Sequence, residues 1–143
     1  MTLHPLKEEE LNSHYTVNYK PEAVYSYTAG QALSKFLLGL KDGKILGRKC
    51  PKCGRVYVPP RMYCEKCFVE NVDYVEVANP YLDAFTVVYY DNEGRKLDKP
   101  VTLGLVRFEE TVGGLLAYVE GEPRLGGRVE IVAYDIPLRV RVK

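Results

Sequence analysis

The sequence predicts a mainly β protein with one helix near its N-terminus, and two observations support this prediction. Two Cys-x-x-Cys pairs, Cys50–Cys53 and Cys64–Cys67, are separated by ten residues. From residue 71 onward, short segments rich in β-branched and aromatic residues alternate with turn sequences. The order of these features predicts an N-terminal extension and helix over residues 1–43, a small ribbon over 44–70 and a β-barrel over 71–143.

The helix is predicted from residue 29 to residue 40. Apolar residues recur there at helical spacing, and Thr28 followed by Gln31 has the pattern of a capping box. The first 27 residues lack a clean period apart from a short helix predicted near Lys7–Ser13. This extension contains Tyr15, Tyr19, Tyr25 and Tyr27. We expect it to pack on another surface, either the protein's own barrel or a partner.

The barrel half is predicted to contain five or six strands. The segments with strand character are Val75–Val77, Ala84–Tyr90, Val101–Phe108, Leu115–Val119, Val129–Tyr134 and Leu138–Val142. Gly104 predicts a bulge or a sharp bend in the middle of its strand. A sandwich normally needs more strands, so the pattern favours a small closed or partly closed barrel.

The composition is that of a globular protein, with 46% hydrophobic and 27% charged residues. No apolar run approaches the roughly eighteen residues that a membrane span requires. Glu8, Glu9 and Glu10 stand where a secretory signal would carry basic and apolar residues. We therefore expect a cytoplasmic protein without a membrane contact, in which thiols stay reduced.

The cysteine spacing predicts a metal site. Two residues between cysteines allow a tight turn that aims both sulfurs at one point, and Gly54 supplies the positive φ that such a turn favours. Phe68 occupies the corresponding place after the second pair. A redox pair would occur singly within a βαβ unit, and disulfides are disfavoured in the cytoplasm. The predicted ligands are Cys50, Cys53, Cys64 and Cys67.

We predict that this metal is a structural Zn²⁺, with iron in the same tetrahedral sulfur cage as the alternative. Because protein ligands fill all four positions, no position remains for an activated water. The positive charge of the chain gathers around the cysteines, since residues 41–66 carry a net charge of +6 and residues 67–143 a net charge of −4.

Together these features resemble a two-domain family first catalogued as a domain of unknown function and now regarded as acyl-CoA-associated. The resemblance covers residues 25–143, and its most specific part is Val56-Tyr57-Val58-Pro59-Pro60-Arg61 between the cysteine pairs. It implies a rubredoxin-like zinc ribbon followed by a small OB-fold barrel. The sequence departs from the family at Phe68 and at Ala78–Tyr81, where the family has a glycine-rich loop.

The resemblance further implies a non-catalytic accessory protein that partners a thiolase-fold enzyme, and in archaea also a hydroxymethylglutaryl-CoA synthase. Such a protein would help to hold or pass a CoA-linked intermediate. Basic side chains near the cysteines suit the CoA phosphates, and nearby tyrosines suit its adenine. The candidate contact residues are Arg48, Lys49, Arg55, Tyr57, Arg61 and Tyr63.

Two other function classes are weighed against this hypothesis. Zinc ribbons and OB-folds often bind single-stranded nucleic acid, and the basic ribbon fits that function, but the acidic barrel half fits it poorly. An enzyme is disfavoured because both histidines, His4 and His14, lie in the extension and the cysteines are used for metal binding. Glu109-Glu110 is expected to be a solvated turn rather than an acid–base pair.

Overall fold

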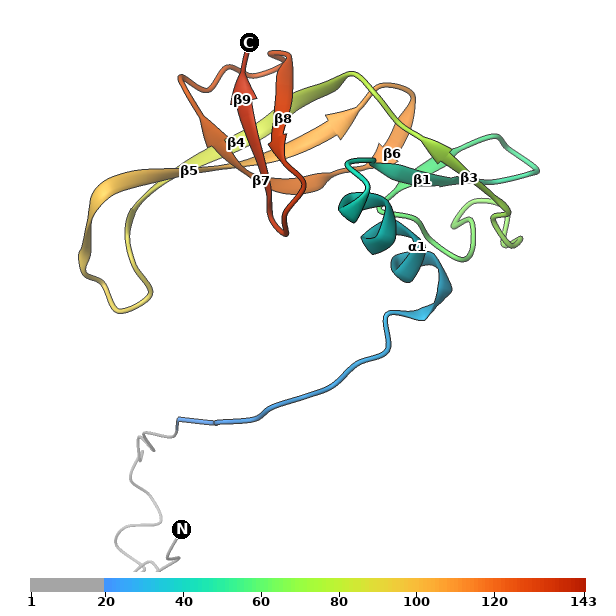
Figure 1. Cartoon of the computed structure of the whole chain (residues 1–143), viewed down its shortest axis with the longest axis horizontal. Coiled ribbons are helices and arrows are strands. Elements are labelled where there is room, and N and C mark those ends of the chain that lie inside the picture. Colours follow the sequence, from blue (N-terminus) through green and yellow to red (C-terminus); the bar gives the residue numbers. More distant parts are fainter. Residues whose placement is uncertain (1–19) are drawn as a thin grey trace, which may run out of the picture.

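The structure is a computed structural model that describes residues 20–143 (Figure 1). The helix predicted near Lys7–Ser13 and the two histidines lie outside the described residues. Within residues 20–143 the elements are α1 (Gly30–Lys41), β1 (Leu46–Lys49), β2 (Val56–Val58), β3 (Asp73–Glu76), β4 (Pro80–Tyr90), β5 (Lys96–Phe108), β6 (Thr111–Gly113), β7 (Leu115–Glu120), β8 (Val129–Ala133) and β9 (Leu138–Val142).

Among the described residues, no helix has both the length and the hydropathy that spanning a membrane requires.

Helix α1 confirms the helix predicted from the apolar spacing. Its buried face contains Ala32, Phe36 and Leu40, which follow one another at four-residue intervals. The expected capping box is not formed, because the N-cap residue is Ala29 and no side chain caps the helix. The Thr28 hydroxyl instead accepts a hydrogen bond from the Gly30 N–H at 3.3 Å.

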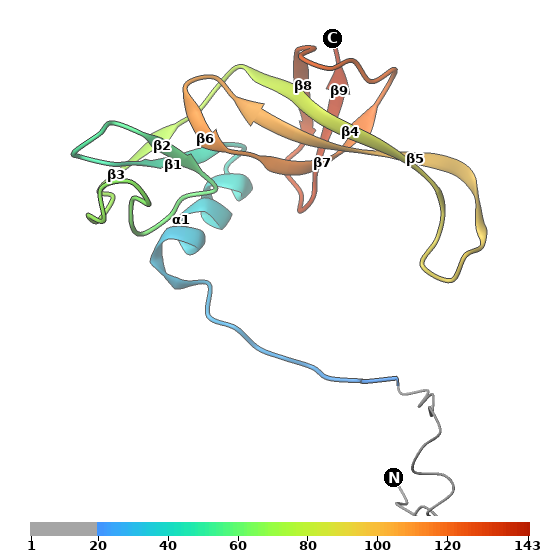
Figure 2. The same cartoon turned by 180° about the vertical axis from the view of Figure 1, so that it is seen from behind.

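The strands form two sheets that meet beside α1 (Figures 1 and 2). The ribbon sheet has the order β3-β1-β2-β6, and the barrel sheet has the order β4-β5-β7-β9-β8. Strand β3 extends the hydrogen-bonded ribbon to Glu76, since Leu46 of β1 pairs with Glu76. The division between ribbon and barrel at residue 70 stays a prediction.

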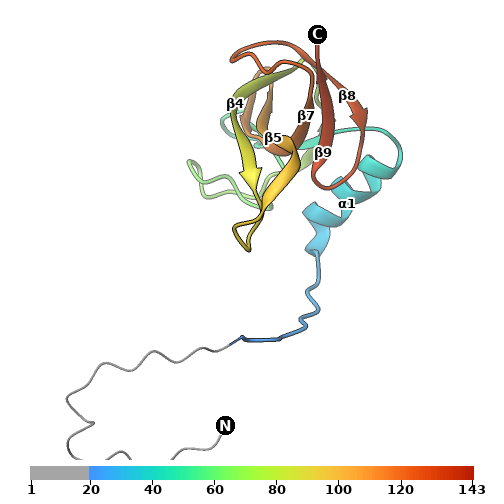
Figure 3. The ribbon, with the colours of Figure 1, turned by 90° about the vertical axis from the view of Figure 1, so that its left-hand side faces the viewer.

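The barrel is partly closed, which is one of the two forms that the strand count predicts (Figure 3). Its two end strands, β4 and β8, approach each other at one end only. There the Leu82 N–H donates to the Gly127 carbonyl at 2.9 Å, and the Gly126 N–H donates to the Leu82 carbonyl at 2.7 Å. An isolated bridge between Tyr81 and Arg128 adds to this contact.

The ribbon and the barrel share one hydrophobic core. Strand β6 lies between two barrel strands in the sequence, yet it pairs in parallel with β2 of the ribbon. The core contains Phe36, Leu40, Ile45, Val58, Leu82, Val106, Phe108, Ala117, Val119, Val129, Leu138 and Val140. Helix, ribbon and barrel residues are all present in this cluster, so the described elements stabilise one another.

Of the two alternatives predicted at Gly104, the bulge is wrong and the sharp bend stays a prediction. Gly104 stays in register with Phe85 and Ala117, and the irregularities of the β4–β5 pairing lie between Leu82 and Ala84 and between Val88 and Tyr90. Glycine is required at this position by close packing. A Cβ there would lie 2.4 Å from Leu82 Cδ1, which is closer than real carbon atoms approach.

We expect Gly113→Ala to lower the free energy of unfolding by about 3 kcal/mol, because two costs add. Gly113 has a φ of 97°, and an added Cβ would lie 2.2 Å from the Val58 carbonyl oxygen. The matched control is Gly94→Ala. Gly94 has a φ of 78° but open space around the added Cβ. It should therefore lose only about 1 kcal/mol. Both variants are measured by urea unfolding. If they lost the same free energy of unfolding, the β2–β6 junction would accommodate a side chain.

Candidate metal centre

The four cysteines lie on two turns with matching backbone hydrogen bonds. In the first turn, the Cys50 N–H donates to the Arg55 carbonyl at 2.8 Å and the Gly54 N–H donates to the Cys50 carbonyl at 3.0 Å. In the second turn, the Cys64 N–H donates to the Val69 carbonyl and the Phe68 N–H donates to the Cys64 carbonyl, each at 2.9 Å. Each Cys-x-x-Cys segment is thus folded into the same tight loop.

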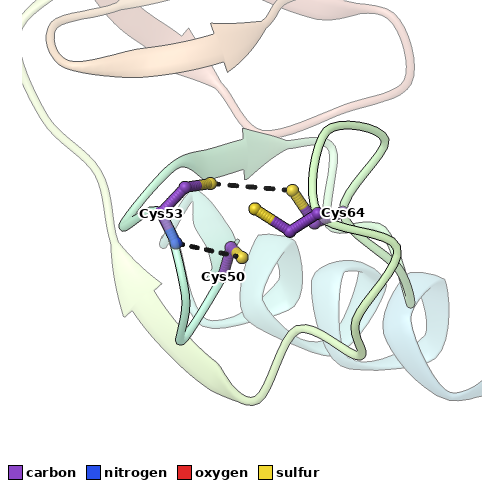
Figure 4. A group of neighbouring side chains, drawn as sticks. Cys50, Cys53 and Cys64 are labelled. Atoms are coloured by element: carbon purple, nitrogen blue, oxygen red, sulfur yellow. Dashed lines mark hydrogen bonds between the residues drawn. The ribbon is translucent and has the colours of Figure 1, made fainter.

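The loops bring the sulfur atoms to one point. The four Sγ atoms all lie within 4.8 Å of one another, and Figure 4 shows Cys50, Cys53 and Cys64 converging. The Sγ atoms of Cys53 and Cys64 are 3.6 Å apart. A tetrahedral Zn–S₄ site has sulfur separations of about 3.8 Å, whereas a disulfide bond measures about 2 Å. The cysteines are therefore free thiols positioned for metal binding.

The electrostatics of the cluster explain why these thiols need a cation. The Tyr57 hydroxyl lies 3.2 Å from the Cys64 Sγ, and this hydrogen bond lowers the pKa of Cys64 to about 6. Burial, together with the neighbouring sulfurs, raises the pKa of Cys67 to about 12. Burial is the largest cause that opposes ionisation of Cys67, and the charge of a neighbouring thiolate adds to it, because like charges at this distance repel. A bound divalent cation removes that repulsion.

Two of the six predicted ligand-contact residues are buried, and the predicted contact set stays a prediction. Arg48 is buried, forms an ion pair with Glu70 at 3.3 Å and lies over the ring of Tyr74. Tyr57 is fully buried beside the metal site. Arg48 nevertheless lines a groove of about 570 Å³ beside α1, together with Tyr74.

The other four predicted contact residues reach the surface. Arg55 and Arg61 both approach the carboxylate of Glu65, at 3.7 Å and 3.1 Å. Two guanidinium groups share one carboxylate, so this part of the ribbon keeps a net positive charge. Lys49 and Tyr63 are exposed nearby in the ribbon.

Two functional features escaped the sequence reasoning. The side chain of Asn71 is completely buried and donates to the Arg61 carbonyl at 2.9 Å, which fixes the return loop before Cys64. The Tyr57 hydroxyl contacts the sulfur of Cys64, one of the predicted metal ligands. No local pattern marks Asn71. For Tyr57 the only signal is its place at the centre of a short strand that faces the second cysteine pair.

Phe68 stands in a strained backbone conformation. Its φ is 54°, close to the 73° of Gly54 at the matching position of the first turn. Its ring is 86% exposed. Left-handed φ values are unfavourable for residues with a Cβ. Phenylalanine at this position therefore lowers the stability of the isolated chain.

Comparison with known proteins agrees with this architecture. The model of the ChsH2 rubredoxin-like zinc ribbon domain matches residues 39–73, and the model of the ChsH2 C-terminal OB-fold domain matches residues 81–134. A crystal structure from Sulfolobus solfataricus, described as a DUF35 protein of unknown function, is 47% identical. That match covers 80% of this chain and 87% of the other, with a TM-score of 0.75.

This chain belongs to the DUF35 family. A second solved structure, described as the Ltp2-ChsH2(DUF35) aldolase, is 19% identical with a TM-score of 0.60. It matches 79% of this DUF35 chain and 95% of its own chain, and at that identity it shows a common fold. No curated protein matches the chain.

We expect Cys53→Ser to reduce the bound metal from about one ion per chain to nearly none, because a serine hydroxyl is a much poorer soft-metal ligand. The ribbon should lose its folded structure, since metal binding in such sites supplies on the order of 10 kcal/mol. Elemental analysis of the purified, tag-free protein measures the metal. Lys52→Ser, at the exposed neighbouring position, should retain it. Full metal content in the Cys53 variant would contradict the ligand assignment.

Phe68→Gly should raise the free energy of unfolding by about 1 kcal/mol, because glycine adopts a φ of 54° without strain. Little burial is lost, since the ring is almost fully exposed. Phe68→Ala is the control that separates the two effects. It removes the ring but keeps the Cβ, so no gain is expected. A destabilised glycine variant in thermal unfolding would show that the ring contributes to the fold.

Proposed function

We propose that this DUF35 chain is a non-catalytic accessory subunit of a thiolase-fold enzyme in the cytoplasm, where it helps to hold a CoA-linked intermediate. The observation that carries the proposal is its common fold with the DUF35 component named together with Ltp2 in the solved aldolase. The family resemblance of the sequence makes a thiolase-fold enzyme the expected partner, with a hydroxymethylglutaryl-CoA synthase as a second one.

The metal in this proposal is Zn²⁺, with iron as the alternative for the same four thiolates. Four protein sulfurs complete a tetrahedral coordination, so the ion holds the two loops together and takes no part in a reaction. This supports an accessory role over an enzymatic one. A reduced compartment is part of the proposal, because oxidised thiols could not bind the ion.

A surface beside α1 supports a protein partner. A groove of about 510 Å³ lies between this helix and the segment that leads into β9. Apolar side chains dominate its lining, which includes Leu33, Phe36, Leu40, Leu116, Ile136 and Pro137. Leu116 and Ile136 are 65% and 71% exposed. Contiguous apolar surface of this kind commonly marks an interface in a soluble protein.

The ribbon supports the CoA-binding part of the proposal. Arg55, Arg61 and Lys49 offer cationic donors for phosphate groups, and the exposed ring of Tyr63 offers a face for adenine. CoA carries its phosphates and its adenine at one end of the molecule. The acyl and pantetheine parts are left for the partner or for the apolar groove.

Nucleic-acid binding remains the weaker alternative. The arginines of β9 are neutralised by carboxylates, because Arg139 pairs with Glu120 at 3.5 Å and Arg141 pairs with Glu130 at 3.3 Å. A single-strand groove requires unpaired positive charge and exposed aromatic rings on the barrel.

We expect the purified chain to form a complex with the thiolase-fold enzyme of its own source, measured by light scattering after gel filtration. Ile136→Asp should prevent the complex, since it places a charge on the apolar surface. Leu125→Asp is the matched control, because Leu125 is about equally exposed but lies outside the groove, and it should leave the complex intact. An Ile136 variant that binds as well as the wild type would rule out this surface.

CoA binding to that complex should weaken about tenfold in Arg61→Glu, because a charge-assisted phosphate contact is replaced by repulsion. Arg124→Glu makes the same charge change at an exposed barrel position and should have no effect. Calorimetric titration measures both. If instead the chain binds single-stranded DNA at micromolar affinity with a steep salt dependence, the nucleic-acid alternative replaces this proposal.

A further inference from the structure

A groove of about 570 Å³ lies between the N-terminal part of α1 and the ribbon strands β1 and β3, which stand side by side in Figures 1 and 2. Its lining includes Gly30, Gln31, Ser34 and Lys35 of the helix, Arg48 of β1 and Tyr74 of β3. It shares no lining residue with the apolar groove beside Ile136. Among the described residues that line it, none is acidic, so its charge favours an anionic ligand.

The guanidinium of Arg48 is the buried charge of this groove. The residue is only 6% exposed. Its Nη2 pairs with Glu70 at 3.3 Å, its Nη1 donates to the sulfur of Met62, and its Cζ lies 5.1 Å from the centre of the Tyr74 ring. These contacts leave the buried Nε without a hydrogen-bond partner. A buried donor without an acceptor is unfavourable, so an acceptor that reaches it gains more than it would at an exposed donor.

The first turn of α1 supplies a second group of donors to the same groove. The helix has 12 residues, and neither a side-chain cap nor an acidic residue stands at its N-terminus. The first backbone N–H groups of a helix have no acceptor within it, and the aligned peptide dipoles add a partial positive charge there. Gly30 donates to the Thr28 hydroxyl, while Gln31 lies in this turn and lines the groove. Two independent donor groups therefore border one space.

We propose that this groove binds the carboxylate of an aliphatic monoacid, with one oxygen at the Arg48 Nε–H and the other at the first turn of α1. The charges favour a carboxylate over a phosphate dianion. Arg48 and Lys35 are positive and Glu70 cancels one of these charges, so one positive charge and the partial charge of the helix terminus remain. A carboxylate brings one negative charge and two acceptor oxygens, which match these two donor groups.

The rest of the groove favours an apolar body on the ligand. Leu38, which is 55% exposed, and the half-buried ring of Tyr74 both line it. Leu38 lies seven residues after Gln31, about 10 Å along the helix axis. An acid whose carboxylate lies at the first turn can therefore extend a short alkyl chain along α1 towards Leu38. This proposal does not depend on the proposed function, since it requires neither a partner protein nor CoA.

The test is a titration of the full-length protein with hexanoate, followed by two-dimensional NMR of the N–H groups. The Gln31 amide and the Arg48 Nε–H should shift together and saturate with one dissociation constant. Hexylammonium has the same alkyl chain with the opposite charge and should cause no saturable shift at either position. Inorganic phosphate should bind about tenfold more weakly than hexanoate, because the groove lacks the charge and the donors for a dianion.

Two variants should change the affinity in opposite directions. Gln31→Glu should weaken hexanoate binding by about tenfold or more, because it places a fixed carboxylate where the ligand carboxylate would lie. An acidic residue in the first turn also stabilises a helix, so this variant should stay folded. Glu70→Gln should strengthen binding by about threefold or more, since it leaves the charge of Arg48 uncompensated. Asn92→Glu is the matched control at an exposed turn outside the groove and should change nothing.

Three results would overturn the proposal. The first is a hexanoate titration in which the shifts of Gln31 and Arg48 do not saturate. The second is equal affinity for hexylammonium, which would show that only the alkyl chain is bound. The third is an unchanged hexanoate affinity in Gln31→Glu, which would show that the carboxylate lies elsewhere on the chain.

Discussion

The fold depends on four thiols whose Sγ atoms lie within 4.8 Å of one another and are positioned to bind a cation. The Tyr57 hydroxyl favours the thiolate of Cys64, while burial and the neighbouring sulfurs disfavour the thiolate of Cys67. The ribbon buries only a small cluster of its own around Cys50, Tyr57 and Cys64. A segment of this size lacks the apolar area to fold alone, so the metal has to supply the missing stabilisation.

Strand β6 extends that stabilisation to the barrel. By pairing in parallel with β2, it inserts a piece of the barrel's chain into the ribbon sheet, and Gly113 allows the close approach to Val58. Val58 in turn belongs to the core shared with the helix and the barrel. Loss of the metal is therefore expected to weaken the barrel as well as the ribbon.

Local patterns in the sequence predicted the features that local chemistry determines. The cysteine spacing gave the metal-ligand candidates, and the apolar spacing located α1 within one residue at each end. The burial of Arg48 and Tyr57 could not be predicted, because it depends on Glu70, Tyr74 and Cys64 arriving from other loops and strands. The sequence correctly marked Gly104 as an unusual position. It could not show the cause, because close packing of side chains and a bulge both require a glycine.

Several features of this chain are unfavourable for an isolated monomer, and they occupy different ends of the molecule. Phe68 holds an exposed ring on a strained backbone in the ribbon, while the uncharged segment Ala84–Tyr90 of β4 lies on the hairpin that projects from the barrel. The shared core and the β2–β6 pairing connect these ends through one packed body. Exposed apolar groups on different sides of one rigid body can be buried against different neighbouring proteins at the same time. The accessory role proposed above would use exposed groups of this kind on more than one side of the chain.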